Sequence, residues 1–219
     1  MFPLGVILAA GEGQRMRPLT YEIPKPLLEV HGKTLLEHQI DFLKQYVESI
    51  AVTVGYKSEK VSQRALQYGA NSIFQNIGGG NATWLNNTFL RKLRLPIIVI
   101  TCDNLMDVNL LDVELESMNS QDLSYLVARV SESELKGDRI LQSEGRVTSI
   151  SQDGNIALLA TGLQIINPGT LSPGLIFDTF HDVWDDLISR QSLSVSRSQP
   201  TKWVAIDTLS DLEDVNKVK

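Results

Sequence analysis

Two glycines and an arginine near the start of the chain have the spacing of a phosphate-binding loop. Residues 8–20 read LAAGEGQRMRPLT, so Gly11 and Gly13 follow an apolar run and Arg15 comes two residues later. Glycine lets backbone N–H groups approach an anion closely, and a guanidinium adds charge-assisted hydrogen bonds to phosphate oxygens. Taken alone, the segment is equally typical of a structural turn with solvated arginines.

Lys25 strengthens the phosphate interpretation because both of its neighbours are prolines. Pro24 and Pro26 stiffen the backbone, which favours an ammonium group held in place and aimed at phosphate. Two other phosphate motifs are excluded. A dinucleotide loop needs a third glycine where Met16 stands, and a Walker loop needs a Gly-Lys-Ser/Thr ending that is absent here.

Alternating strands and helices in the first half must position these residues. Apolar runs predict strands at 4–10, 49–55, 71–75 and 96–103, and helical spacing predicts helices at 34–46, 58–68 and 82–92. Such alternation is typical of parallel strands with right-handed crossovers and helices on both faces. We therefore expect an α/β fold, a Rossmann-like three-layer α/β/α arrangement with a mixed, mainly parallel sheet.

The pattern loosens in the second half. It predicts a strand at 123–130, short strands within 139–166 with turns at 144–145 and 153–154, a helix over 175–190, a strand near 202–206 and a last helix from about Thr208. We expect one domain over residues 1–219. Its nucleotide-binding half is residues 1–120, and its acceptor-binding half, the wall of a second pocket, is residues 121–219.

Composition narrows the class of partner. A net charge of −6 over 219 residues argues against nucleic acid as the main partner, although a few local cations suffice for a nucleotide. No apolar run approaches the roughly 18 residues of a membrane span, so we expect no membrane contact. The single cysteine, Cys102, favours a reducing cytoplasm. The oligomeric state is not fixed, and a homodimer is left open.

A longer pattern resembles the signature of the sugar-1-phosphate nucleotidyltransferases. It reads Gly11-x-Gly13-x-Arg15-x-x-Pro18-x-Thr20, then Pro24-Lys25-Pro26, then Val30 and GKTLL at 32–36. The resemblance implies the fold of the nucleotide-diphospho-sugar transferases. It also implies joining of an NTP to a sugar 1-phosphate, which gives an NDP-sugar and pyrophosphate, with Mg²⁺ as cofactor.

The resemblance also implies roles for individual residues. Arg15 and Lys25 would be the catalytic cations, and Asp103, at the end of the strongest predicted strand, would bind the metal. Its place fits that role independently, because ligands sit at the carboxyl ends of parallel strands. A capping or turn aspartate is the alternative. The expected nucleotide-binding residues are Leu8, Ala9, Ala10, Gly11, Gly13, Gln75, Gly80 and Asn81.

The acceptor half departs from the family pattern. Gly162 in ATGLQIINP matches the glycine of a strand that lies against the sugar, and Asp138 is the other expected acceptor-binding residue. The family's Glu-Lys pair is not found, although Gln152 and Asp153 lie near its place. The identity of the acceptor is therefore open.

The end of the chain departs further. Trp-Val-Ala-Ile-Asp-Thr stands where most members have Trp-x-Asp-x-Gly-Thr, so the expected metal carboxylate falls on Ala205. Because side chains alternate along a strand, Asp207 faces the same way, and we expect it to be the second metal ligand. The alternative is that Asp207 only caps the last helix. The AIDT ending also resembles the phosphocholine cytidylyltransferase branch.

Three functions are therefore compared. The first is transfer of a nucleotide to a sugar 1-phosphate, and the second is cytidylyl transfer to phosphocholine or a similar phosphorylated alcohol. The third is a catalytically silent nucleotide-binding or regulatory protein, which Ala205 and the missing Glu-Lys pair suggest. In the first two, the partners are an NTP and a phosphorylated small-molecule acceptor.

Overall fold

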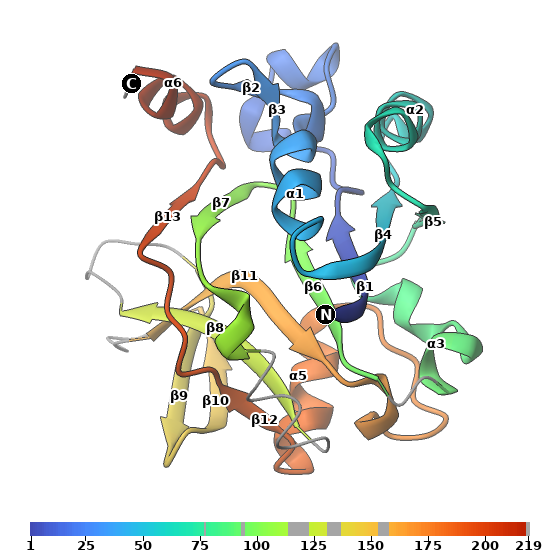
Figure 1. Ribbon diagram of the computed structural model, residues 1–219, viewed down its shortest axis with the longest axis vertical. Coiled ribbons are helices and arrows are strands. Elements are labelled where there is room, and N and C mark those ends of the chain that lie inside the picture. The colour runs from blue at the N-terminus through green and yellow to red at the C-terminus, as the bar shows by residue number, and fades with distance from the viewer. Residues whose placement is uncertain (77, 93–94, 114–122, 131–136, 153–157, 218–219) are drawn as a thin grey trace.

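The computed structural model describes residues 1–76, 78–92, 95–113, 123–130, 137–152 and 158–217. Its centre is a nine-stranded mixed sheet (Figure 1). In order across the sheet, the strands are β5 (Ser72–Gln75), β4 (Val47–Val54), β1 (Phe2–Leu8), β6 (Ile97–Thr101), β11 (Leu158–Ile166), β8 (Ser124–Val130), β12 (Leu193–Val195), β10 (Arg146–Ser151) and β9 (Arg139–Ser143).

The first-half strands β5, β4, β1 and β6 are parallel, and β1 lies between β4 and β6. The strand order changes direction beside β1, and ligands of open α/β sheets bind at such a switch point. The segments that follow β1 and β6 therefore meet at one edge of the sheet. Beyond β6, the neighbouring strands are antiparallel except for the pair of β12 with β8.

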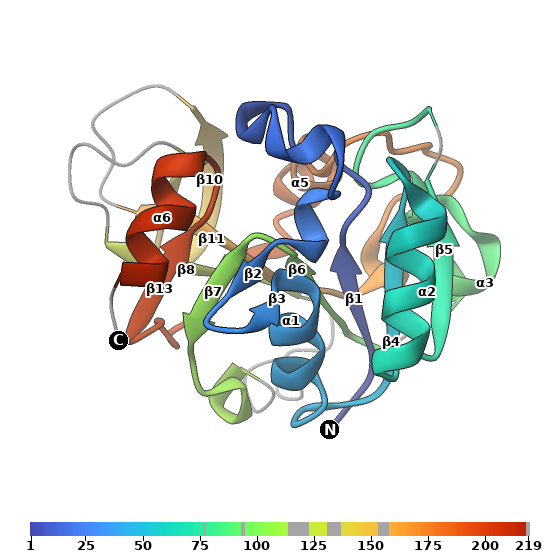
Figure 2. The same ribbon diagram turned by 90° about the horizontal axis from the view of Figure 1, so that it is seen from above.

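Helices cover both faces of this sheet (Figures 1 and 2). Alternation along the strands separates two cores, with Ile7 and Ile98 on one face and Val6 and Ile97 on the other. The first face is covered by α1 (Leu35–Leu43) and α2 (Ser58–Tyr68), and the second by α3 (Thr88–Lys92) and α5 (Phe180–Ser189). The last helix, α6 (Leu209–Lys217), packs at the edge of the first core, against residues 29–30. The expected mixed α/β fold with a parallel core is confirmed.

Two small β units lie outside the main sheet. A hairpin joins β2 (Glu29–Val30) to β3 (Lys33–Thr34), and an antiparallel ribbon joins β7 (Asn104–Asp107) to β13 (Lys202–Ala205). The ribbon brings the end of the chain to the end of β6. Between β1 and β2, where the prolines exclude a regular helix, the backbone forms short 3₁₀ turns at Gln14–Met16, Leu19–Tyr21 and Lys25–Leu27.

The structure departs from the predicted elements in the second half. The helix expected over 175–190 begins at Phe180, because a capping box formed by Thr179 and Asp182 starts it there. The apolar Ile176 is 84% exposed, so it belongs to a loop and not to a buried helix face. Strands β2, β3, β7 and β12 were not expected, and the turn predicted at 153–154 lies outside the described residues.

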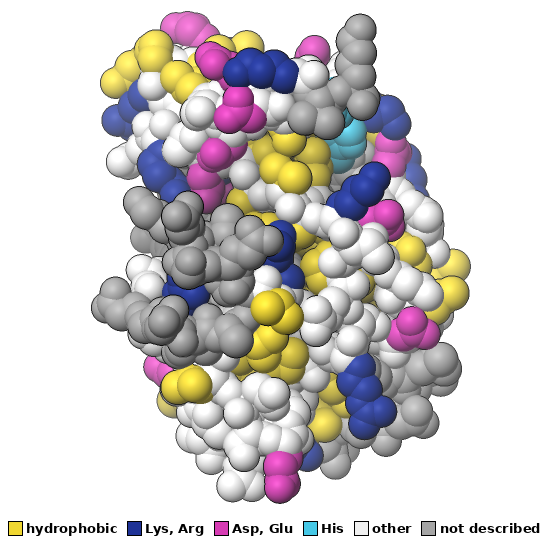
Figure 3. All heavy atoms as spheres, turned by 90° about the vertical axis from the view of Figure 1, so that its left-hand side faces the viewer, with side chains coloured by type: hydrophobic (Ala, Val, Ile, Leu, Met, Phe, Trp, Pro, Cys, Tyr) yellow, Lys and Arg dark blue, Asp and Glu magenta, His cyan; other side chains and the backbone are white. Residues whose placement is uncertain are grey.

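The surface carries charged side chains of both signs. Acidic and basic side chains are interspersed around apolar groups on the face that carries α6 and β13 (Figure 3). Within the described residues, every helix is too short or too polar to cross a bilayer.

Candidate active site

Two cavities meet at the carboxyl ends of β1 and β6. One of about 530 Å³ lies against the glycine segment, and one of about 240 Å³ lies against β11, α5 and β13. The residues that line both cavities are Leu8, Arg15, Asn81, Thr101, Asp103 and Asp207. After the roles expected from the sequence, we call the larger the nucleotide-side cavity and the smaller the acceptor-side cavity. Their shared edge holds one predicted cation and both predicted metal ligands.

The glycine segment is shaped to fit the side chain of Lys25. Gly13 has a φ of +63°, and a Cβ atom on it would lie 2.8 Å from Cβ of Lys25. The carbonyl oxygen of Gly13 accepts a hydrogen bond from the Thr20 hydroxyl at 3.0 Å. Any larger residue at this position would be strained and would push Lys25 away, which explains the need for glycine here.

Lys25 lies between the two predicted metal carboxylates. Its Nζ atom is 2.5 Å from Oδ2 of Asp103 and 3.0 Å from Oδ1 of Asp207. The lysine side chain is 12% exposed, so its charge is largely removed from water. Arg15 donates a hydrogen bond to the same Oδ1 of Asp207 at 2.8 Å. Two cations and two carboxylates thus form one connected group.

Backbone pairing fixes the two aspartates relative to each other. Asp103 lies in the turn between β6 and β7, and its carbonyl oxygen accepts a hydrogen bond from Ile206 N–H at 2.9 Å. The next pair along the ribbon is Asn104 with Ala205. Asp207 therefore follows the ribbon directly into the site. Both Ala205 and Asp207 line the acceptor-side cavity, as strand alternation predicts.

Asp207 does not cap the last helix. Thr208 is the N-cap residue, because its hydroxyl accepts from Asp211 N–H at 3.3 Å and α6 begins at Leu209. Asp211 Oδ2 accepts from the N–H groups of Asp207 and Thr208 at 2.9 and 2.7 Å. Burial acts to raise the pKa of Asp211, but these hydrogen bonds prevail and hold that pKa below its usual range. The Asp207 side chain is left to bind Lys25 and Arg15.

The donor set is suited to a magnesium ion. Mg²⁺ is commonly held by one or two carboxylates, with substrate phosphates and water completing its shell. Asp103 and Asp207 both contact one cationic atom, Nζ of Lys25, so their oxygens converge on a position for positive charge. Among the described residues, no group of three or more His, Cys, Asp and Glu side chains could enclose a metal without substrate oxygens.

The one cysteine, Cys102, belongs to the core. Its side chain packs among buried apolar residues at the end of β6. Burial, followed by the negative charge of Asp103, raises the pKa of its thiol far above the usual range. A thiol in this state is inert as a nucleophile.

The acceptor-side cavity has aromatic walls. Phe180 and Trp184 come from α5, and Trp203 comes from β13. Both tryptophan N–H groups are used inside the protein, because Trp184 donates to Gln164 at 2.8 Å and Trp203 to the Thr161 carbonyl at 3.0 Å. The polar N–H groups of these rings are therefore not available to a ligand, and the Arg129 guanidinium lies over the Trp203 ring at 5.3 Å from its centroid.

Away from the shared edge, the charge in the same cavity is negative. Asp138 is the charged residue there among the described residues that line the cavity. Its Oδ1 lies 3.3 Å from Nε2 of His181 and accepts a hydrogen bond from Gln152 at 3.4 Å. Gly162 lines the same wall, where the register of β11 against β8 shifts between Ala160 and Gln164.

The sequence of this chain matches a known protein family. The model of the MobA-like NTP transferase domain matches residues 5–139, a span that includes the glycine segment, Lys25 and Asp103. The chain belongs to this family. The predicted resemblance to nucleotidyltransferases is thereby confirmed, and so is the expectation of an enzyme family of that type.

Relatives of this MobA-like domain act on different acceptors. The chain is 33% identical to a choline-phosphate cytidylyltransferase of Streptococcus pneumoniae over 106 residues, 48% of this chain and 46% of that protein. It is 30% identical to a mannose-1-phosphate guanyltransferase of Pichia angusta over 138 residues, 58% of this chain and 38% of that protein. The matches thus span less than half the length of these curated relatives.

A solved structure extends the likeness in fold to the whole chain. The CTP:phosphocholine cytidylyltransferase from Streptococcus pneumoniae superposes with a TM-score of 0.74 at 22% identity. The alignment covers 100% of this chain and 99% of that one. At this identity the comparison shows the fold, which is the nucleotide-diphospho-sugar transferase type expected from the sequence.

The structure places most of the predicted residues of this transferase domain on the two cavities. Those that line the nucleotide-side cavity are Leu8, Ala9, Ala10, Gly11, Gly13, Arg15, Lys25, Asn81, Asp103 and Asp207. Gln75 and Gly80 line neither of the two cavities. Gln75 is exposed at the end of β5, and its neighbour Asn76 lines the cavity instead, because successive side chains point to opposite faces.

Other residues of the site had no recognised signal in the sequence. The aromatic wall joins residues of α5 and β13, which only the tertiary fold brings together. Asp178 contacts Gly80, 98 positions away. One signal was available, since the pattern Asp-Thr-x-x-Asp occurs at both 178–182 and 207–211.

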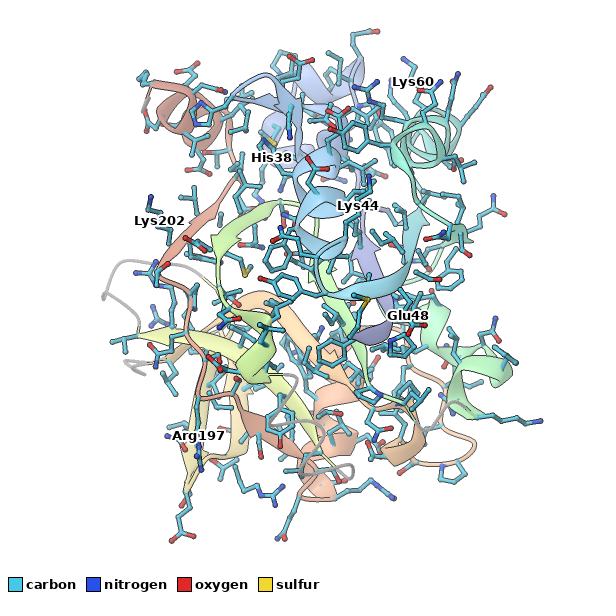
Figure 4. All side chains as sticks on the ribbon, viewed as in Figure 1. His38, Lys44, Glu48, Lys60, Arg197 and Lys202 are labelled. Carbon is cyan, nitrogen blue, oxygen red and sulfur yellow. The ribbon has the colours of Figure 1, made fainter. Side chains whose placement is uncertain are left out.

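His38, labelled on α1 in Figure 4, has its Nε2 2.8 Å from the Val30 carbonyl oxygen, as is typical of a structural histidine.

Proposed function

We propose that this protein transfers the nucleotidyl group of an NTP to the phosphate of a small acceptor. A phosphate oxygen of the acceptor attacks the α-phosphorus, the bond to the β-phosphate breaks, and pyrophosphate leaves. The observation that carries the proposal is the position of Lys25, which lines the nucleotide-side cavity and contacts Asp103 and Asp207, both at the shared edge of the two cavities. A reaction between two anions needs positive charge at that place.

The nucleotide-side cavity suits a triphosphate. Backbone N–H groups of residues 11–14 and the guanidinium of Arg15 would bind the β- and γ-phosphates. Arg15 is 68% exposed on its side chain, so it has room to exchange Asp207 for a phosphate. The acceptor phosphate is already an anionic nucleophile, so this reaction requires no protein base.

Asp103 and Asp207 would hold Mg²⁺ when it is bound. The ion supplies neutralisation of phosphate charge at the reacting centre. The protein's own residues then align the two substrates, and Lys25 places its charge between the α-phosphate and the acceptor phosphate. Loss of one such charged contact typically costs a factor of about 10² to 10³ in rate.

For the acceptor, the observations favour a phosphorylated alcohol with a cationic end. Aromatic faces attract cations, and ammonium groups with several methyl substituents are commonly bound by such rings. Phe180, Trp184 and Trp203 line the acceptor-side cavity, and Asp138 adds negative charge away from the reacting edge. Phosphocholine combines the required phosphate and cation. Similarity to a choline-phosphate cytidylyltransferase supports the same class, with CTP as the donor.

A sugar 1-phosphate is the second candidate. Gly162 lies on the wall of the acceptor-side cavity, where the family pattern places a glycine against the sugar. Similarity to a mannose-1-phosphate guanyltransferase supports this class. A neutral sugar can use the Asp138 carboxylate as a hydrogen-bond acceptor, whereas a cationic acceptor is also attracted by its charge, which is why we place the sugar second.

Pyrophosphate release with MgCl₂ tests the proposal. The four common NTPs and dTTP are each combined with phosphocholine, phosphoethanolamine, glucose 1-phosphate and mannose 1-phosphate. We expect turnover with one NTP and a cationic phospho-alcohol. Turnover with sugar phosphates alone would establish the second candidate. Nucleotide binding without turnover for every pair would overturn the enzyme proposal and leave a regulatory protein.

A further inference from the structure

The chain builds the same local structure twice beside the two cavities. In residues 178–182 and 207–211, the last aspartate of Asp-Thr-x-x-Asp accepts hydrogen bonds from the N–H groups of the first two residues. The corresponding distances are 3.0 and 2.8 Å in the first copy and 2.9 and 2.7 Å in the second. In each copy, the leading aspartate is left with its carboxylate directed away from the helix. In the second copy that aspartate is Asp207, a residue of the proposed site.

In the first copy the leading aspartate is Asp178, and it holds the segment that carries Gly80 and Asn81. Gly80 N–H donates to Oδ1 of Asp178 at 2.6 Å, and Ala82 N–H donates to the Asp178 carbonyl oxygen at 2.9 Å. The two backbones are in close contact, because a Cβ atom on Gly80 would lie 2.8 Å from the carbonyl carbon of Asp178. Only glycine permits this approach, which gives Gly80 a role although it lines neither cavity.

A third contact links this segment to the acceptor-side wall. The side-chain oxygen of Asn81 accepts from Phe180 N–H at 2.9 Å. Asn81 lines both cavities, whereas Phe180 and Trp184 line the acceptor-side cavity. The rings of Trp84, Phe180 and Trp184 follow one another at centroid distances of 6.4 and 6.2 Å. Hydrogen bonds and ring contacts therefore hold the segment at 79–82 against the start of α5.

We infer that Asp178 is a positioning residue that couples the two cavities. By tying Gly80 to the N-terminus of α5, it sets Gly79 and Asn81 on the nucleotide side together with Phe180 and Trp184 on the acceptor side. Ordering one wall by a bound substrate orders the other, so each substrate improves the binding of the second. The kinetic part of this inference rests on the proposed function, whereas the positioning of Gly80 by Asp178 does not.

Hydrogen–deuterium exchange of the ligand-free protein tests the tie directly. Asp178→Ala removes the acceptor for Gly80 N–H, and Asp178→Asn keeps an acceptor oxygen at the same place. We expect residues 79–82 to exchange about tenfold faster in Asp178→Ala and close to the wild-type rate in Asp178→Asn. Asp185→Ala, which changes an exposed aspartate of the same helix, is the control. Unchanged exchange in Asp178→Ala overturns the inference whatever the protein catalyses.

Kinetics with the NTP and acceptor that turn over test the coupling. We expect Asp178→Ala to raise KM for both substrates about fivefold to tenfold, with kcat changed less than about twofold, and Asp178→Asn to restore both. Asp185→Ala should match the wild type. If KM for only one substrate rises, or if kcat alone falls, the coupling is wrong. If the wild-type protein is inactive with every substrate pair, the proposed function is contradicted. The exchange experiment would still show whether Asp178 holds the segment that carries Gly80.

Discussion

The Nζ atom of Lys25 lies 2.5 Å from Oδ2 of Asp103, although 78 positions separate the two residues in the chain. The contact joins the segment after β1 to the turn after β6, the two strand ends that meet at the switch point of the sheet. Asp207, from a third segment of the chain, contacts the same ammonium. Lys25 thus contacts both carboxylates, and Arg15, bound to Asp207, supplies the second positive charge that balances them.

Replacement of Lys25 should abolish most of the activity. Lys25→Ala removes the cation between the reacting phosphates, so we expect kcat to fall by about 10² to 10³. Steady-state pyrophosphate release measures the change. Lys33→Ala, which removes a surface lysine paired with Asp41, is the matched control and should keep wild-type kcat. A Lys25→Ala enzyme within threefold of the wild type would remove the lysine from the reacting centre.

Asp207 should set the magnesium requirement. Asp207→Asn keeps the size of the side chain and removes its charge, so we expect the Mg²⁺ concentration for half-maximal rate to rise about tenfold or more. A MgCl₂ titration at fixed NTP shows this. Asp214→Asn, on the surface of α6 beside Lys217, should leave the titration unchanged. Equal rates for Asp207→Asn and the wild type at limiting Mg²⁺ would contradict the metal assignment.

Asp138 should discriminate between acceptor classes. If the acceptor is cationic, Asp138→Asn removes a charge–charge attraction, and KM for phosphocholine should rise about fivefold to fiftyfold with KM for the NTP unchanged. Initial rates at varied acceptor concentration measure this. Asp185→Asn, on the exposed face of α5, is the control of equal charge. If KM for the acceptor is unaltered in the Asp138→Asn variant, the acceptor is a neutral sugar phosphate rather than a cationic alcohol.

Acid should weaken the protein through the two capping carboxylates. Hydrogen bonds from Thr179 and Asp178 N–H lower the pKa of Asp182, and those from Asp207 and Thr208 lower that of Asp211. A carboxyl with a lowered pKa in the folded state stabilises the fold above its unfolded pKa, near 4, and this contribution disappears as the pH falls through the folded value.

The double variant Asp182→Asn with Asp211→Asn isolates this effect. We expect its free energy of unfolding in urea to lie below that of the wild type at pH 7, and to differ from it less at pH 3 than at pH 7. Asp185→Asn should follow the wild type throughout. A constant difference between double variant and wild type at both pH values would show that these two carboxyls do not carry the pH dependence.

Cys102 should resist thiol reagents in the folded protein. Its side chain is 4% exposed in relative terms, and burial raises the pKa of the thiol, so little thiolate forms near neutral pH. We expect reaction with a disulfide reagent at pH 8 to be at least about tenfold slower in buffer than in urea. Equal rates under both conditions would place Cys102 in an accessible position.

The nucleotide side of the site could be predicted because its signals are local. The strand, glycine segment and Lys25 lie within residues 2–26, and the strand that precedes Asp103 is a continuous apolar run. The acceptor side depends on contacts between distant segments. Trp203 reaches its cavity on a ribbon, and Phe180 reaches it on a helix whose start was misplaced by five residues, because the exposed Ile176 imitates a buried position.

The role of Asp207 was ambiguous for a chemical reason. Aspartate and threonine are both favoured N-cap residues, so Asp207-Thr208 offers two candidates for one cap. Local pattern alone does not choose between them. The choice becomes clear only with the contacts of Asp207 to Lys25 and Arg15, which lie 182 and 192 positions away.

The β7–β13 ribbon has a consequence for how such sites change over evolution. Asp103 is anchored to the main sheet through β6, so moving it would disturb the core. Asp207 is carried by a two-stranded unit outside that sheet, beside Ala205, where the same face of the ribbon is already directed into the cavity. A carboxylate can therefore migrate two residues along this unit with little penalty to folding. In the proposed metal site, the fold therefore fixes one ligand, whereas mutation can shift the other along the chain.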